Sequence, residues 1–164
     1  MYRVILSVAA IVGALVSQTC WAATATSSLA VSANVTTVCT MSSTPLAFGE
    51  VAITGATTAA TSGTATVSVT CTGGGTYTVG MDNGLHNVAA QRFLASGSNL
   101  LAYGLFQDPA HGTVWTNTGA GLVLGTGNAA VQPLTIYGAI PTGLPLVSGS
   151  GIPYSDTVQV TLTY

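Results

Sequence analysis

The sequence has very few charged side chains. Its 164 residues include no lysine, two arginines and four acidic residues. A protein that binds nucleic acid uses basic side chains to displace the counterions of the phosphates, so we expect no nucleic-acid partner. The surface must consist mostly of Ser, Thr, Asn, Gln, Gly and backbone. Such a neutral surface favours association between copies, although a secreted protein with a bland surface would share this composition.

Patterns for metal binding and catalysis are missing too. The two histidines, His86 and His111, are far apart in sequence, and no Cys-x-x-Cys pair accompanies them. Asp82, Asp108 and Asp156 follow or begin predicted strands, where carboxylates commonly cap turns. We therefore interpret them as turn residues and predict no enzyme activity, no metal and no cofactor.

Long hydrophobic runs are limited to residues 4–16, directly after Arg3. A run of thirteen residues is too short to span a bilayer, and a basic start followed by small residues is typical of a cleavable signal peptide. We assign residues 1–22 to this signal, with cleavage after Ala22 or as late as Ala25. No later apolar run is longer, so we expect the exported chain to have no membrane anchor.

Three cysteines are present, and Cys20 leaves with the signal peptide. The remaining pair, Cys39 and Cys71, is most simply interpreted as one disulfide, because the compartment outside the inner membrane is oxidising. Closing a loop of this size contributes about 3.5 kcal/mol in the chain-entropy description. Two free buried thiols are the alternative, which export disfavours.

The exported chain shows strand patterns bounded by turn residues and no helical periodicity. About 140 residues suffice for one domain, and several short strands at this spacing predict an all-β sandwich. In the clearest strand, apolar residues alternate with polar ones and point to one face. That strand is residues 154–164, with Val158, Val160, Leu162 and Tyr164 on the apolar face. The other predicted strands are residues 64–71, 76–82, 92–95, 100–107, 122–124 and 133–140.

A further alternating segment comes directly after the signal peptide. Its apolar residues recur with a period of two, which is typical of a strand that buries one face. They are Leu29, Val31, Ala33 and Val35. No Gly or Pro occurs between residues 29 and 41, so the segment cannot form a tight hairpin with the next strand of the chain. Its partner must be distant in the sequence or belong to another molecule.

Several of these segments, in this order and spacing, resemble the spore coat protein U domain family, which includes the subunits of Csu-type archaic chaperone–usher pili. The resemblance covers nearly the whole exported chain. It rests on Leu46-Ala-Phe-Gly49, residues 63–73, the Tyr77 strand leading to Asn83-Gly84, residues 92–94, residues 101–108, residues 136–140 and residues 154–158.

The resemblance implies an incomplete immunoglobulin-like β-sandwich of six strands that lacks its seventh. Residues 23–38 would form an N-terminal donor-strand extension, and residues 39–164 the pilin domain. In such pilins a periplasmic chaperone first lends a strand, and the extension of the next subunit replaces it at the outer-membrane usher. The donor residues would be Leu29, Val31, Ala33 and Val35.

On the acceptor side we predict that Val158, Val160 and Leu162 line the groove and that Tyr164 helps the chaperone engage the chain; all four can also be ordinary core residues. The expected function is that of a structural subunit of a secreted, cell-surface pilus, contributing to surface adhesion or biofilm formation. Its partners would be other copies or related pilins, the chaperone and the usher. Two alternatives remain open: a spore-coat or other surface-coat protein, and a monomeric binding module whose own N-terminal strand fills the groove.

Overall fold

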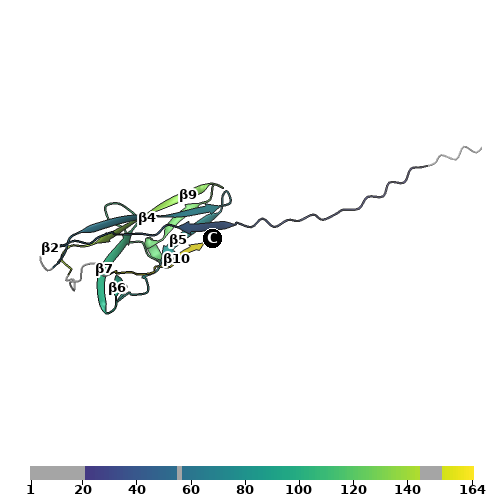
Figure 1. Ribbon diagram of the computed structural model, residues 1–164. Helices are drawn as coiled ribbons and strands as arrows, with labels where there is room; N and C mark the ends of the chain where they lie inside the picture. The colour runs from purple at the N-terminus through teal and green to yellow at the C-terminus, as the bar shows by residue number, and fades with distance from the viewer. Residues whose placement is uncertain (1–20, 55–56, 145–152) are drawn as a thin grey trace, which may run out of the picture. The chain divides into compact units, whose positions relative to one another are not determined.

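The structure is a computed structural model that describes residues 21–54, 57–144 and 153–164 (Figure 1). Most of the predicted signal peptide, residues 1–20, lies outside the described residues. The chain divides into two units, residues 1–34 and residues 35–164. In the first unit, residues 21–34 form no helix or strand.

The second unit is built from antiparallel strands (Figure 1). One sheet has the order β1 (Cys39–Ser43), β4 (Thr61–Cys71), β9 (Val131–Ile140), β7 (Asn99–Phe106) and β6 (Arg92–Ser96). The second has the order β10 (Val160–Thr163), β5 (Thr76–Met81) and β8 (Val123–Thr126). A two-stranded ribbon joins β2 (Ile53–Thr54) to β3 (Thr57–Thr58), and η1 (Gly119–Gly121) is a short 3₁₀ turn. The all-β fold is confirmed, although the described residues form ten strands rather than six.

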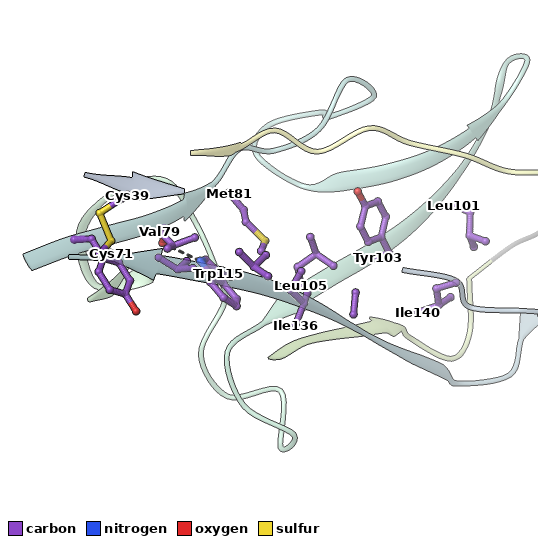
Figure 2. Close-up of a cluster of buried hydrophobic side chains, with 14 residues drawn as sticks. Cys39, Cys71, Val79, Met81, Leu101, Tyr103, Leu105, Trp115, Ile136 and Ile140 are labelled. Atoms are coloured by element: carbon purple, nitrogen blue, oxygen red, sulfur yellow. Dashed lines mark hydrogen bonds between the residues drawn. A yellow bond between two sulfur atoms is a disulfide. The ribbon is translucent and has the colours of Figure 1, made fainter. Parts of the chain in front are cut away.

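The core consists of side chains that alternate along the strands. Val67 and Val69 of β4 and Val79 of β5 are completely buried. Trp115 comes from the loop between β7 and β8, and its indole N–H donates to the carbonyl oxygen of Val79 at 3.0 Å. Figure 2 shows Val79 and Trp115 clustered with Met81, Leu105 and Ile136. Burial of each large apolar side chain contributes about 1.5–3 kcal/mol.

A pair of glycines makes room for the segment that leaves β1. Gly63 of β4 lies opposite Gly138 of β9. A Cβ atom on Gly138 would lie 2.9 Å from a methyl carbon of Leu46 and 3.0 Å from the ring of Phe48. A Cβ atom on Gly63 would lie 2.7 Å from the carbonyl oxygen of Ala47. Residues 46–48 therefore pack where the sheet has no side chains, which explains the Leu-Ala-Phe motif physically.

The final predicted strand is shorter than expected. Only β10 is regular within residues 154–164, because the preceding segment exchanges partners. Ser155 forms two backbone hydrogen bonds with Ala95 of β6, at 2.9 and 3.1 Å. Four residues later the carbonyl oxygen of Gln159 accepts from the backbone N–H of Asp82, at the end of β5. The segment thus moves from the edge of one sheet to the other, and no continuous ladder forms. The other predicted strands match β4 to β9 with small shifts at their ends.

Candidate functional site

The free edge of β10 is the first element of the candidate site. β10 pairs with β5 through Val160 opposite Met81 and Leu162 opposite Val79. Hydrogen-bonded and non-hydrogen-bonded pairs alternate in an antiparallel ladder. Because Gln159 bonds to the end of β5, the odd-numbered residues direct their backbone groups toward β5. Val160 and Leu162 direct theirs away from β5, where no strand pairs with β10 in the described part of the chain.

β1 has a free edge of the same kind. It lies at the end of its sheet and pairs with β4 alone among the described strands. The backbone N–H of Thr72 donates to the carbonyl oxygen of Val38 at 3.0 Å, so the even-numbered residues bond to β4. Cys39, Met41 and Ser43 therefore direct their backbone groups outward. Each sheet ends in a strand that can accept a further partner.

The side chains along these two edges leave the core partly uncovered. Val158, Val160 and Leu162 are half-buried and pack against the core cluster, as does Met41 of β1. The polar residues between them, such as Thr161, are exposed. The predicted acceptor residues thus form one apolar row, except that Tyr164 at its end is 60% exposed. That this row receives a donor strand stays a prediction.

The predicted donor residues are exposed. Leu29, Val31 and Val35 are 87%, 85% and 97% exposed, and Ala33 is exposed too. No strand forms within residues 21–38. Three large apolar side chains on one face of an extended segment are a feature of binding sites rather than of ordinary surfaces.

The predicted disulfide between Cys39 and Cys71 is present. The two residues are opposite each other at one end of the β1–β4 ladder, and both are buried. The bond therefore fixes the start of β1, directly after the predicted extension, to the end of the longest strand in the described chain.

Comparison with known proteins identifies the family. The family model of the spore coat protein U domain matches residues 25–161. This chain belongs to the spore coat protein U domain family. It is 33% identical over 112 residues to protein U of Myxococcus xanthus, a match that covers 62% of this chain and 60% of protein U.

A solved structure shares the fold of this spore coat protein U domain. It is the crystal structure of the CsuC–CsuE chaperone–tip adhesion subunit pre-assembly complex from the archaic chaperone–usher Csu pili of Acinetobacter baumannii. The TM-score is 0.55 at 17% sequence identity, and the match covers 79% of this chain and 40% of that one. The chain thus spans 60% of protein U and 40% of the solved chain, less than two thirds of either.

A buried carboxylate lies beside the apolar row of this spore coat protein U domain. The side chain of Asp156 is 1% exposed, and its Oδ2 accepts from the hydroxyl of Tyr103 at 2.7 Å. Its Oδ1 accepts from the backbone N–H groups of Leu85 and His86 at 3.1 and 3.2 Å, and lies 3.0 Å from Nδ1 of His86. Burial and then the bond to Asp156 raise the pKa of Tyr103, so its hydroxyl stays a donor.

Asp156 accepts from the backbone N–H groups of Leu85 and His86, about seventy positions earlier in the chain, so it caps a distant turn instead of its own. The interpretation as local turn residues is confirmed for the other two carboxylates, although Oδ1 of Asp82 also accepts from the distant backbone N–H of Gln159 at 2.9 Å. Asp82 accepts from the backbone N–H of Gly84, and Asp108 from that of Gly112. The sequence carries no local signal that separates Asp156 from them, since its role depends on contacts made through the fold.

Arg92, the arginine outside the signal peptide, also has a role that sequence patterns do not indicate. It is buried, and its Nε and Nη2 donate to the carbonyl oxygen of Asp82 at 2.9 and 2.6 Å. Nη2 also donates to the carbonyl oxygen of Trp115 at 2.7 Å. Burial lowers the pKa of Arg92, and nearby Tyr103 and Asp82 oppose this change. The guanidinium thus connects the end of β5 to the loop before β8.

The described residues contain no group of three or more His, Cys, Asp or Glu side chains placed to hold a metal ion. None of the helices there is long and apolar enough to cross a membrane.

Proposed function

We propose that this protein is a structural subunit of a secreted chaperone–usher pilus, which polymerises by donor-strand complementation. The observation that carries the proposal is that two apolar rows of this chain have the same spacing, one that could accept a strand and one that could supply it. β10 has a free edge and a half-exposed apolar row, and residues 29–35 form an exposed apolar row with the same spacing of two. An extended segment that adds to a free sheet edge gains backbone hydrogen bonds and buries alternate side chains.

The expected energy is sufficient for assembly. Burial of Leu29, Val31 and Val35 with the small Ala33 contributes on the order of 6 kcal/mol at ordinary transfer values. The backbone ladder adds to this, and ordering the exposed segment opposes it. Ala33 fills less space than its neighbours, so either the groove is shallow at that position or this is where the incoming strand displaces the chaperone.

The proposed partners are a consequence of this mechanism. A subunit with an uncovered apolar row needs a periplasmic chaperone to cover that row before assembly. At an outer-membrane usher, another copy or a related pilin then replaces the chaperone. The similar solved structure is itself a chaperone–subunit complex, which supports the chaperone as a partner. The product would be a cell-surface fibre that contributes to adhesion or biofilm formation.

The proposal can be tested with a synthetic peptide of residues 27–37 added to the full chain. A ligand that binds only the folded state stabilises it by about 2.7 kcal/mol at one hundred times its Kd, so the Tm should rise by several degrees. The control is the same peptide with Val31→Asp. If both peptides raise the Tm equally, or neither does at millimolar concentration, the acceptor assignment is wrong.

Two alternatives give different outcomes. A coat component built by the same strand chemistry, which the match to protein U favours, would form sheets or amorphous deposits instead of fibres in electron micrographs. A self-complemented module would elute from a size-exclusion column as a stable monomer when expressed without a chaperone. Its Tm would not change when the peptide is added.

A further inference from the structure

The apolar row of β10 changes character at one end. Exposed and half-buried residues alternate through residues 155–163, so Asp156 is in phase with Val158, Val160 and Leu162, although only residues 160–163 form regular strand. As whole residues all four are half-buried, but the side chain of Asp156 is only 1% exposed, so the exposed part of Asp156 is its backbone. The side chain at position 156 is therefore covered, next to the apolar row that begins at Val158.

The cover is the loop that comes after β5. The backbone N–H groups of Leu85 and His86 both donate to the carboxylate of Asp156. Gly84 has φ +80°, and a Cβ atom at this position would collide with Oδ2 of Asp156. Glycine thus lets the loop close over the carboxylate at residues 84–86. Tyr103 donates to Oδ2 from β7 and completes the cover.

We propose that Asp156, held by Tyr103 and residues 84–86, is a stop that closes one end of the acceptor row and fixes the register of the incoming strand. The occupant is the 29–35 segment of a second copy, so this inference rests on the proposed function. Asp156 acts as a positioning residue. An apolar side chain pushed beyond Val158 would have to displace the loop and leave a buried carboxylate without its partners, which is strongly unfavourable.

The two rows have equal length, which supports the stop. Positions 158, 160, 162 and 164 are the open places, and the segment offers apolar side chains at four positions with the same spacing. Hydroxyl residues, Ser27 and Thr37, flank those four. One register alone therefore covers all four open places with apolar side chains. A shift by two residues toward the stop would force one of them under the loop.

Antiparallel pairing is the more stable arrangement and gives the register explicitly. Val35 of the second copy then lies beside Val158, and Leu29 beside Tyr164. If the strand slid past the stop by two residues, Ala33 would lie beside Val158 instead. These two neighbours of Val158 distinguish the proposed register from the slipped one.

Cross-linking of the full chain, assembled in its own host, measures this difference. One variant carries Val158→Cys with Val35→Cys, and the other carries Val158→Cys with Ala33→Cys. A difference of about 1.4 kcal/mol corresponds to tenfold, so the first variant should give roughly ten times more disulfide-linked copies. Equal yields, or no cross-link in either variant although fibres form, would overturn the register. Loss of fibres together with failure of the peptide test would instead overturn the proposed function.

The role of the stop is tested by Tyr103→Phe in both cysteine backgrounds. This change removes the hydroxyl that bonds to Asp156 and keeps the ring that contacts Phe48 edge-on at 5.9 Å. The matched control is Tyr137→Phe on β9. The ratio of the two cross-links should fall about threefold or more in Tyr103→Phe and stay constant in the control. A purely structural role would lower the Tm of Tyr103→Phe without changing the ratio, and that result would refute the stop.

Discussion

Replacing Val31 with Asp separates folding of the subunit from its assembly. Val31 is 85% exposed in the chain, so the free energy of unfolding should change by less than about 0.5 kcal/mol. In an occupied groove the same change loses about 1.5–3 kcal/mol of apolar burial. It also buries a carboxylate, which costs several kcal/mol more. A combined loss of at least about 4 kcal/mol weakens the contact between subunits roughly a thousandfold.

The matched control is Ser32→Asp, which places the same charge on the opposite face of the same segment. Electron microscopy would count fibres on cells that express each variant, and circular dichroism would compare the Tm of the isolated chains. We expect fibres with Ser32→Asp, none with Val31→Asp, and the same Tm for both. If Val31→Asp assembled as well as Ser32→Asp, residues 29–35 would not be the donor strand.

Four further predictions concern single residues. Gly63→Ala should lower the free energy of unfolding by about 1–3 kcal/mol. The loss should exceed that of Gly138→Ala, because the new Cβ at position 63 meets a rigid backbone oxygen, whereas the one at position 138 meets side chains. Chemical denaturation of both variants tests this order. Cys71→Ser should cost about 3.5 kcal/mol, measured against the oxidised parent chain, whereas a loss below about 1 kcal/mol would contradict the loop-closure argument. Ala33→Leu should impair assembly, and unchanged fibre yield would contradict both explanations of the small side chain, the shallow groove and the site of chaperone displacement. Backbone N–H groups, first that of Gly112, lower the pKa of Asp108, so its stabilising contribution is present above its usual pKa of 3.8 and is lost as pH falls through the folded value. Asp108→Asn should flatten the acid dependence of the Tm, and an unchanged profile would argue against this cap.

Local periodicity was enough to predict most of the fold. The alternation in residues 64–71 and 133–140 predicts strands that the structure forms as β4 and β9. The same rule places Val160 and Leu162 on one apolar face, as observed. These predictions succeed because a strand with one buried face repeats every two residues, whatever its partner.

The features that the sequence did not predict depend on contacts between distant segments. The period-two pattern continues from residue 154 to residue 164, but the segment exchanges β6 for β5 as its partner and loses its regular ladder. The carboxylate of Asp156 resembles that of Asp108 in sequence context, yet one is buried among distant donors and the other caps its own turn. Periodicity reports which face is apolar and does not report which neighbour covers it.

The disulfide between Cys39 and Cys71 has a mechanical consequence for a chain that is pulled by its extension. Tension applied before residue 39 would load β1, an outer strand that pairs with β4 alone among the described strands. The covalent bond lies at the first pair of the β1–β4 ladder and transfers the load directly to β4. β4 is hydrogen-bonded on both sides, by β1 and β9, so the load reaches a central strand instead of an outer one.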